Sequence, residues 1–302
     1  MSVTIIKQHN RQQKNIIAWG LLLLLALVWG TSFFLVKQGL TVLTPIQVAG
    51  LRISAAFVAV LPWAIIHVQK VERAQLKFIF MSGMLGMLLP AILFSIAQQH
   101  IISSVAGVLN ALTPAFTVLI AFLFFQQKVH LEQVIGLGLG LLGSVSLAFQ
   151  QAPAQSQGVT FNAYALLIIA ATLMYATNAN LLSSKLRNIK PFYLSTLSIS
   201  LIGPLALVLL FASDIEKNIN QPNSLIPILA IIFLGLVSTA LATVLFNYLL
   251  QMTSVVFASS VTYLIPLVAV FWGLVDGEKL LLWHFVGIIC IILGVYLVNR
   301  RK

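Results

Sequence analysis

The residues best suited to bind a small molecule are polar and aromatic side chains inside long apolar runs. They are Trp29, Thr31, Ser32, Arg52, Phe94, Gln98, Asn110, Tyr175, Asn178, Asn247, Thr262 and Tyr263. Polar groups are costly in hydrocarbon, so we expect most of these side chains to face a protein interior or a water-filled cavity. Together they predict an aromatic, mildly polar pocket for a small organic molecule.

Arg52 is the only charge well inside a predicted span, ~10 Å along the helix from Pro45 at about 1.5 Å per residue. A guanidinium at this depth suits a carboxylate or another anion. It can also snorkel to the interface or hydrogen-bond to helix-end carbonyls, which is a structural role. The sequence allows both interpretations.

Two prolines interrupt the hydrogen bonding of predicted helices beside these residues. Pro114 has no N–H, so the carbonyl of Asn110, four residues earlier, loses its helical partner. Pro266 does the same to the carbonyl of Thr262. Side chains or a water can reorganise such a kink for purely structural reasons. The freed groups can equally face a substrate cavity and ease gating, because irregular backbone at membrane depth is tolerated beside a cavity.

Patterns that would indicate catalysis or a metal are missing from the sequence. None of the six Asp and Glu residues lies in the middle of a predicted span, so a buried carboxylate relay has no residue to carry it. The five histidines lie at or beyond the span ends without metal-ligand spacing. No P-loop, His-Glu-x-x-His or Gly-x-Ser-x-Gly motif occurs. We expect no enzyme activity, no cofactor and no metal, and substrates that are neutral, zwitterionic or anionic.

Glycines in one late apolar run spell two known patterns. Gly138, Gly140 and Gly143 form G-x-G-x-x-G, but a dinucleotide site needs a preceding strand and an acid ~20 residues on. No Asp or Glu occurs between Glu132 and Asp214. The glycines are instead expected to let two helices approach closely, as in G-x-x-x-G.

Ten apolar runs must position these side chains. Hydrophobic residues make up 60% of the 302 residues and charged residues 8%, against roughly 25% charged in an ordinary soluble domain. The runs are continuous and Leu-rich rather than alternating, and most are about as long as a ~20-residue membrane helix. The sequence therefore predicts an all-α integral membrane protein with ten transmembrane helices. Their ranges are 16–36, 46–66, 78–97, 102–125, 131–149, 162–184, 191–212, 225–249, 254–275 and 281–299.

This composition excludes a soluble enzyme, a nucleic-acid-binding module and a disordered chain. The net charge of +11 reflects six acids rather than dense basic patches, so the expected partner is the lipid bilayer and not nucleic acid. The first apolar run continues to Val36, longer than the about 7–15 residues of a signal peptide core, and is expected to stay as a span. Cys290 is the single cysteine and forms no intrachain disulfide.

The charges also orient the chain. With the N-terminus in the cytoplasm, 13 of the 17 Lys and Arg residues lie inside. Four of the six acids, Asp214, Glu216, Asp276 and Glu278, then lie outside. An even number of spans with both termini in the cytoplasm is therefore predicted.

The two halves of the sequence correspond to each other, 16–149 to 162–299. At an offset of 146 residues, the matches are Trp29 with Tyr175, Thr31 with Thr177 and Pro45 with Pro191. At an offset of 152, they are Phe94 with Phe246, Ala106 with Ala258, Asn110 with Thr262 and Pro114 with Pro266. After a one-residue gap, they are Gly136 with Gly287 and Gly143 with Gly294. Five spans is an odd number, so the second five-helix repeat must be inverted relative to the first. Inverted repeats are typical of secondary transporters with a site near the midplane.

Several short motifs, in order and in both halves, resemble one family. They are Trp29-Gly30-Thr31-Ser32 running to Lys37, Pro45 followed by Arg52, Leu112-Thr113-Pro114-Ala115-Phe116, Leu264-Ile265-Pro266, and Gly277-Glu278-Lys279-Leu280 leading to Gly287. Over nearly the whole chain they resemble the EamA-type family of the drug/metabolite transporter superfamily. The resemblance implies a ten-helix carrier of small metabolites, often moved outward, with cytoplasmic termini. Gln127 departs from it, because it stands where the family usually has an acid and where the second half has Glu278.

These observations predict a secondary transporter, a permease or exporter, of small organic metabolites such as amino acids. It would work by alternating access in a bacterial inner membrane, without an obligate protein partner. The choice of amino acids rests on the resemblance alone. An alternative is an exchanger of phosphorylated or sugar-linked metabolites, which needs two or more converging cations, whereas only Arg52 and Lys37 are available. An intramembrane enzyme or membrane sensor is the alternative from another class, and it lacks a visible catalytic constellation or soluble output domain.

Overall fold

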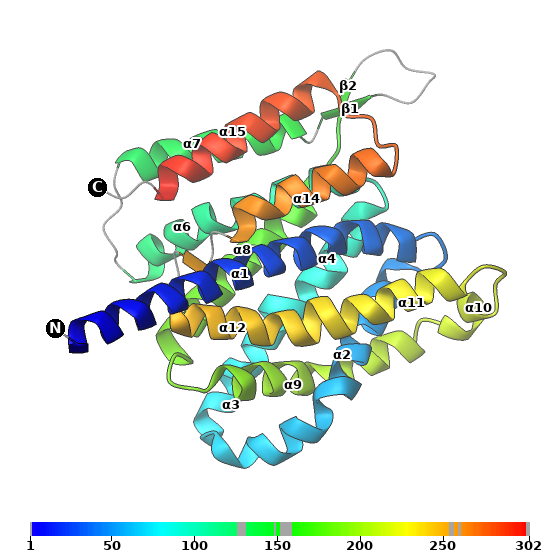
Figure 1. The fold of residues 1–302 in the computed structure, drawn as a ribbon. Helices are drawn as coiled ribbons and strands as arrows, with labels where there is room; N and C mark the ends of the chain where they lie inside the picture. The colour runs from blue at the N-terminus through cyan, green and yellow to red at the C-terminus, as the bar shows by residue number, and fades with distance from the viewer. Residues whose placement is uncertain are drawn as a thin grey trace.

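Helices make up nearly all of the computed structural model (Figure 1), which describes residues 2–125, 131–147, 149–151, 159–253, 257–258 and 261–299. The first half contains α1 (Ser2–Gly39), α2 (Pro45–His67), η1 (Val68–Lys70), α3 (Arg73–Gly83), η2 (Met84–Leu88), α4 (Leu89–Gln98), α5 (Ser103–Leu109), η3 (Asn110–Leu112), α6 (Thr113–Phe125) and α7 (Leu131–Leu147). The second contains α8 (Ala165–Lys185), α9 (Pro191–Phe211), α10 (Ile215–Ile219), α11 (Leu225–Phe233), η4 (Leu234–Leu241), α12 (Ala242–Met252), α14 (Val261–Val275) and α15 (Leu282–Asn299). Helix α1 begins and helix α15 ends at the same end of the bundle (Figure 1).

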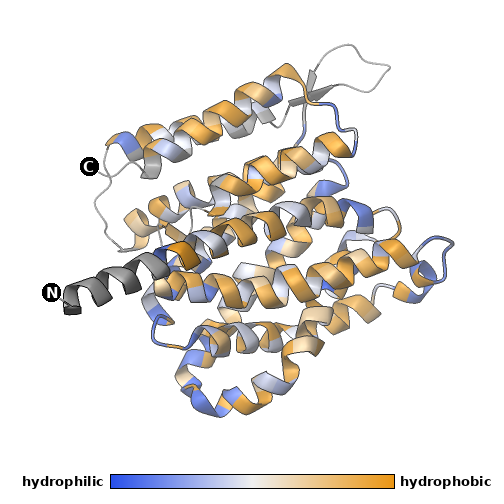
Figure 2. Cartoon of the chain, viewed as in Figure 1, coloured by the Kyte–Doolittle hydropathy of each residue, from blue (hydrophilic) through white to orange (hydrophobic). Residues whose placement is uncertain are grey.

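Seven of the helical segments are long and apolar enough to cross a bilayer. They are Asn15–Gly39, Pro45–Lys70, Arg73–Gln98, Ser103–Phe124, Ala165–Lys185, Pro191–Phe211 and Leu225–Met252. Three shorter apolar helices are Val134–Gly143, Leu264–Val275 and Leu282–Gly294. Large apolar side chains such as Phe124, 76% exposed, and Ile226, 75% exposed, lie on the outside of the bundle. Hydrophobic residues predominate along the helices (Figure 2). Such a surface suits lipid and not water, so the chain is a multi-pass helical membrane protein.

Two predicted spans differ clearly from the helices of the structure. Helix α1 begins at Ser2 rather than residue 16, because no proline or glycine precedes Gly20 to stop it. The predicted span 102–125 is broken at η3, where Pro114 withholds a backbone donor. In the range 254–275, residues 257–258 and helix α14 are helical, and residues 254–256 and 259–260 lie outside the described part.

A two-stranded hairpin is a further difference and the one exception to an all-helical fold among the described residues. Strand β1 (Phe149–Gln151) pairs antiparallel with β2 (Val159–Phe161), Phe149 facing Phe161. Phe, Val and Thr favour strands, and this loop carries enough of them to form three paired positions. The predicted span 131–149 therefore ends two residues early, at Leu147.

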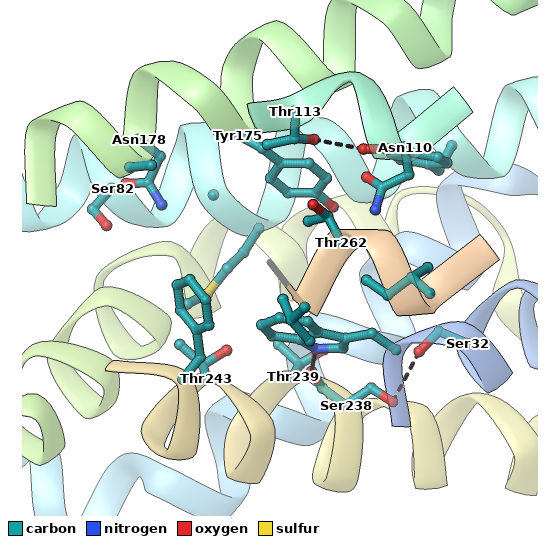
Figure 3. A pocket seen from close by; sticks show the side chains of 18 of the residues that line it. Ser32, Ser82, Asn110, Thr113, Tyr175, Asn178, Ser238, Thr239, Thr243 and Thr262 are labelled. Carbon is teal, nitrogen blue, oxygen red and sulfur yellow. Dashed lines mark hydrogen bonds between the residues drawn. The ribbon is translucent and has the colours of Figure 1, made fainter. Parts of the chain in front are cut away.

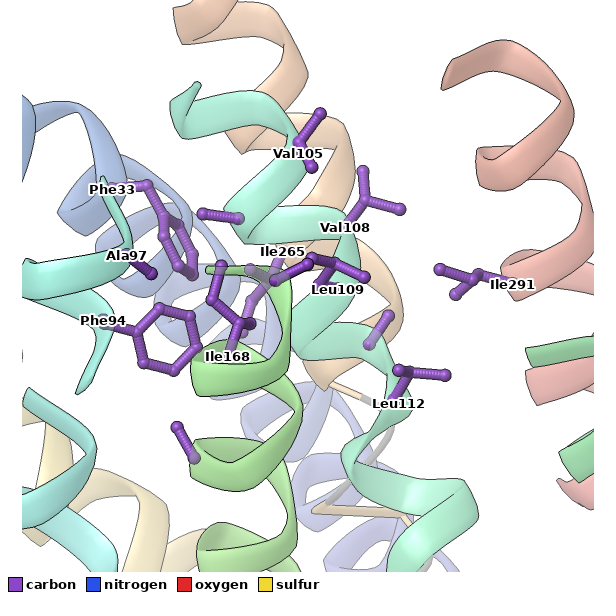
Figure 4. Close-up of a cluster of buried hydrophobic side chains, with 14 of the residues drawn as sticks. Phe33, Phe94, Ala97, Val105, Val108, Leu109, Leu112, Ile168, Ile265 and Ile291 are labelled. Atoms are coloured by element: carbon purple, nitrogen blue, oxygen red, sulfur yellow. The ribbon is translucent and has the colours of Figure 1, made fainter. Parts of the chain in front are cut away.

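The largest buried apolar cluster joins the two halves of the chain. It brings Phe33 of α1 and Phe94 of α4 together with Leu109 of α5, Ile168 of α8 and Ile265 of α14 (Figure 4). The Phe33 and Phe94 rings meet edge to face with centroids 5.6 Å apart. Helix α8 packs between α4 and α6, and α1 packs between α12 and α14. Residues of one half thus fix the position of helices in the other.

Glycines make two close helix contacts that mirror each other. A side chain at Gly143 of α7 would meet the carbonyl of Gly287 of α15 at 2.7 Å. One at Gly294 of α15 would meet the carbonyl of Gly136 of α7 at 2.4 Å. Positions 136 and 287, and 143 and 294, are the pairs that correspond in the sequence. The predicted role in helix packing is thus confirmed for Gly140 and Gly143, which lie where α7 packs against α15, but it is wrong for Gly138, because nothing lies within 4 Å of a side chain there.

Replacing Gly294 by leucine is expected to separate α7 from α15, because the added atoms have no room beside Gly136 and Gly140. Overpacking of this kind typically costs about 1–3 kcal/mol. The thermal unfolding midpoint of the purified protein in detergent measures it. Gly138→Leu is the matched control, since nothing lies within 4 Å of a side chain at Gly138. Equal shifts for the two variants would contradict the glycine contact.

Candidate functional site

A cavity of ≈ 200 Å³ lies inside the bundle, between helices of both halves (Figure 3). Ten of the twelve predicted binding residues line it: Trp29, Ser32, Arg52, Phe94, Gln98, Asn110, Tyr175, Asn178, Asn247 and Thr262. They come from α1, α2, α4, η3, α8, α12 and α14. The fold therefore brings together side chains that are up to 233 residues apart, Trp29 and Thr262.

The two other predicted residues are not placed in the cavity. The hydroxyl oxygen of Thr31 accepts a hydrogen bond of 3.0 Å from the indole N–H of Trp272, so Thr31 joins α1 to α14. The side chain of Tyr263 lies outside the described part of the structure. Trp272 also stacks on Phe34, with ring centroids 4.9 Å apart, which explains why this face of α1 is taken up by packing.

Further lining residues were not predicted from the sequence. Those with polar side chains are Ser82, Thr113, Thr117, Ser198, Ser238, Thr239 and Thr243. Ser and Thr are common in membrane helices, because their hydroxyls can donate to the backbone of their own helix. Residue type alone therefore does not identify them as cavity residues. The internal correspondence is a signal that finds one of them, since Ser198 stands 146 residues after Arg52.

The cavity wall contains residues of the two halves in corresponding pairs. They are Trp29 and Tyr175, Ser32 and Asn178, Arg52 and Ser198, Gly86 and Ser238, Phe94 and Phe246, and Asn110 and Thr262. The first three pairs are 146 residues apart and the last three are 152 apart. Apart from Phe94 and Phe246, the two residues of each pair differ in chemistry, so the two halves present mostly different groups to a bound molecule.

Two π-helical turns widen the helices where they meet the cavity. They are η2 and η4, and each supplies two lining residues, Gly86 and Met87 in η2, Ser238 and Thr239 in η4. In η4, the backbone carbonyl of Ser238 accepts a bond of 3.0 Å from the indole N–H of Trp29. π-helical turns inside α-helices are frequent at functional sites, because they expose backbone carbonyls and shift side chains.

The break at η3 positions Asn110. The hydroxyl and the backbone N–H of Thr113 both donate to the carbonyl of Asn110, at 2.8 Å for the hydroxyl. This satisfies the carbonyl that Pro114 leaves without its helical partner, so the kink is stabilised by a side chain. The amide of Asn110 lines the cavity (Figure 3). At Pro114, therefore, a side chain stabilises the kink and a polar group beside the kink faces the cavity. Pro266 instead lies inside an uninterrupted α14.

Arg52 is a cation in the cavity wall without an acidic partner among the described residues. Its Nε donates a hydrogen bond of 2.7 Å to the hydroxyl of Thr239 in η4. No Asp or Glu of the described chain lies within 4.0 Å of it, and its Nη groups donate to no protein acceptor there. The guanidinium is thus held at one edge, with its remaining donors available.

Acceptor oxygens around the cavity are also unpaired. Among the described residues, the amide oxygens of Gln98, Asn110, Asn178 and Asn247 are buried without a hydrogen-bond partner. The amide nitrogen of Gln98 donates to the carbonyl of Phe33 at 2.8 Å, and that of Asn247 donates to the hydroxyl of Ser195 at 2.8 Å. Each bond fixes the orientation of its amide group and leaves the amide oxygen without a hydrogen-bond partner among the described residues.

One end of the bundle carries a buried charge network. The carboxylate of Glu278, in the loop before α15, accepts from the backbone N–H groups of Ser103 and Ser104 and from the Ser104 hydroxyl, at 2.8, 3.0 and 2.7 Å. Lys37, near the end of α1, forms ion pairs with Glu278 and Asp276. The network joins α1, α5 and the loop between α14 and α15. The side chain of Glu278 is 2% exposed.

The pKa of Glu278 follows from these contacts. Burial alone would raise the pKa, but hydrogen bonds from Ser104, Lys37 and the Ser103 N–H together hold it below the ordinary value of 4.5. A carboxyl with a depressed pKa stabilises the fold above its unfolded-state pKa and loses that effect as the pH falls through the folded-state value.

We therefore expect a pH-dependent contribution of Glu278 to stability. The difference in thermal midpoint between the wild type and Glu278→Gln should be largest near pH 7 and should shrink below about pH 4.5. Melting curves in detergent between pH 7 and pH 3.5 measure it. A difference that stays constant across this range would mean that the charge of Glu278 does not stabilise the fold.

The described residues contain no group of three or more His, Cys, Asp or Glu side chains that could hold a metal ion. The site consists of one guanidinium, amides, hydroxyls and aromatic rings. This set can bind and orient a small polar molecule, and it contains no pair of nucleophile and base in the part of the chain described.

Comparisons with known proteins point to transport. The EamA-like transporter family matches residues 16–149 and again residues 162–300. The "Uncharacterized inner membrane transporter YedA" of Escherichia coli (strain K12) is 28% identical over 291 residues, which cover 94% of this chain and 91% of that protein. The "Probable terminal-alkyne amino-acid exporter" of Streptantibioticus cattleyicolor is 26% identical and covers 94% and 93%. One crystal structure superimposes with a TM-score of 0.58 at 14% identity, over 95% of this chain and 96% of that one, a likeness of fold.

Proposed function

Because the chain belongs to the EamA-like transporter family, we propose that it is a secondary transporter of small organic metabolites such as amino acids. The observation that carries this proposal is the cavity, which is lined by corresponding residues of the two halves. A site between two related halves is what alternating access requires, because each half can move against the other around a bound molecule.

The proposed architecture is ten transmembrane helices in two inverted five-helix repeats. The paired contacts of α7 with α15 support it, and so do two further glycines. A side chain at Gly83 would meet the carbonyl of Ser198 at 2.6 Å, and one at Gly235 would meet the carbonyl of Arg52 at 2.4 Å. Each contact converts into the other when the halves are exchanged, as expected for a two-fold axis between them.

The proposed cycle opens the cavity first to one side of the membrane and then to the other. The network of Lys37, Asp276 and Glu278 joins both halves at one end, so it must break when that end opens. The distribution of Lys and Arg supports an orientation with this end outside and both termini in the cytoplasm, in a bacterial inner membrane. The helix break at Pro114 would ease the motion, and so would Pro266, which removes one backbone hydrogen bond within α14.

The alternative substrate class, phosphorylated or sugar-linked metabolites, has weaker support. A dianionic phosphate needs several converging donors, whereas Arg52 is the single cation among the lining residues. Relatives named as an amino-acid exporter and as a "Probable amino-acid metabolite efflux pump" of Salmonella typhimurium favour the smaller organic class.

A counterflow screen in proteoliposomes tests the proposal. Vesicles preloaded with amino acids or other small metabolites are supplied with the labelled compound outside, with and without a pH gradient. We expect saturable exchange for at least one compound and no strict need for the gradient, since no lining residue is an acid. Absence of saturable flux for every compound would overturn the transport proposal.

A further inference from the structure

Resting on the proposed transport function, we propose that the cavity binds a molecule with one carboxylate, held by Arg52, and a hydrogen-bond-donating group such as a primary ammonium, held by buried amide oxygens. Two walls of the same cavity thus have opposite polarities, and a substrate must carry both groups.

The Arg52 wall suits one carboxylate. The bond from Nε to the Thr239 hydroxyl fixes the plane of the guanidinium and leaves the Nη donors without a protein acceptor in the described chain. A planar fork of two N–H donors matches the two oxygens of a carboxylate. Arg52 is a half-buried cation without an acidic partner among the described residues, so an anionic group beside it would supply the missing charge partner.

The second wall suits a donor. The amide oxygens of Gln98 and Asn110 are both unpaired, and each residue is only 7% exposed. Unmade hydrogen bonds of buried acceptors cost free energy, and a primary ammonium has three N–H donors to supply. In Figure 3, Asn110 and Thr239 project from ribbons on opposite sides of the cavity. Arg52 is bonded to Thr239, so the cation and this acceptor approach a bound molecule from different walls.

The same arrangement disfavours molecules with only one of the two groups. An amine without a carboxylate would bring a second cation beside Arg52 and leave its Nη groups unpaired. A carboxylic acid without an amine would leave the amide oxygens unpaired. The remaining wall, with Phe94, Phe246, Ile53 and Met87, is apolar and suits a hydrocarbon side chain.

Two matched sets of compounds test the proposal in wild-type proteoliposomes by counterflow. One is L-leucine, isopentylamine and 4-methylpentanoate; the other is L-phenylalanine, 2-phenylethylamine and 3-phenylpropanoate. We expect saturable exchange of an amino acid that exceeds its amine and its acid by about ten- to hundredfold, as for loss of a hydrogen bond to a charged group. An amine exchanged as well as its amino acid would overturn the role of Arg52.

Variants at corresponding positions separate recognition from folding. Arg52→Gln is expected to remove the preference for the amino acid over the amine, and Arg52→Lys to keep part of it without the planar fork. The double variant Arg52→Ser with Ser198→Arg moves the cation to the corresponding position and should restore part of the preference. Lys217→Gln, an exposed surface cation, is the control and should change nothing.

The outcomes distinguish this inference from the transport proposal. If the wider counterflow screen finds a transported solute but neither amino acid is exchanged above its amine, the transport proposal stands and the inference fails. If no compound is exchanged in the screen, both fail. If Arg52→Gln lowers the flux of amino acid and amine by the same factor in a protein of normal abundance and melting temperature, Arg52 is a structural residue and the inference fails.

Discussion

Replacing Glu278 by lysine is expected to unfold or severely destabilise the protein and to abolish transport. The substitution would put a second cation against Lys37 and against the N–H groups of Ser103 and Ser104, which now donate to a carboxylate. Breaking a buried, hydrogen-bonded charge pair costs about 3–5 kcal/mol. Thermal midpoint, membrane abundance and counterflow of the same preparation measure the effect.

Milder changes at position 278 test how the carboxylate acts. Glu278→Gln keeps an acceptor for Ser104 but loses the ion pair, and should cost less, about 1–2 kcal/mol, because Lys37 is 36% exposed and partly screened. The charge swap Lys37→Glu with Glu278→Lys should not rescue the single change, since the cation would still face the Ser103 and Ser104 donors. Full rescue by the swap would show that only the ion pair matters.

Replacing Gly235 by leucine is expected to impair both folding and transport. A side chain there would lie 2.4 Å from the backbone carbonyl of Arg52 and 2.9 Å from the Cβ of Ala55, so α2 would have to move. Overpacking of a close helix contact costs about 1–3 kcal/mol. Because the displaced turn of α2 carries Arg52, counterflow should fall more than protein abundance does. Membrane abundance and initial flux per molecule are the two measurements.

Two other glycines serve as comparisons for Gly235. Gly83→Leu, at the corresponding contact with the Ser198 carbonyl at 2.6 Å, should destabilise the fold to a similar degree. Gly20→Leu should be tolerated, since nothing lies within 4 Å of a side chain there. If Gly83→Leu were tolerated as well as Gly20→Leu while Gly235→Leu was not, the two contacts would not be equivalent.

Much of the helix arrangement could be predicted from the sequence, because burial in lipid leaves a strong pattern. Apolar runs separated by polar breaks predict helix ranges within a few residues, as for 191–212 against α9 (Pro191–Phe211). Ten of the lining residues were predicted for the same reason, since an amide such as Asn247 or a charge such as Arg52 has few tolerable places at membrane depth.

Other features depend on contacts that leave no local pattern. The ion pairs of Lys37 could not be predicted, because its partners Asp276 and Glu278 lie in the other half of the chain. The π-helical turns η2 and η4 arise from packing rather than from an unusual residue type. Thr31 has the residue type of a cavity residue, yet its hydroxyl oxygen accepts a hydrogen bond from the indole N–H of Trp272. Gln127, which corresponds to Glu278, lies outside the described residues.

Labelling of a cysteine in the cavity from each side of the membrane tests alternating access directly. The chain has one cysteine, so Cys290→Ser gives a cysteine-free background in which Ala179→Cys places a reporter in the cavity wall. A membrane-impermeant maleimide is added to either face of oriented vesicles, with Lys217→Cys as the marker for the face at which α1 ends. If the cavity opens alternately to the two sides, the reporter thiol is labelled from both faces, at rates that a transported solute changes, and labelling from the marked face is faster in Glu278→Gln. Labelling from one face alone, unchanged by solute and by Glu278→Gln, would contradict alternating access.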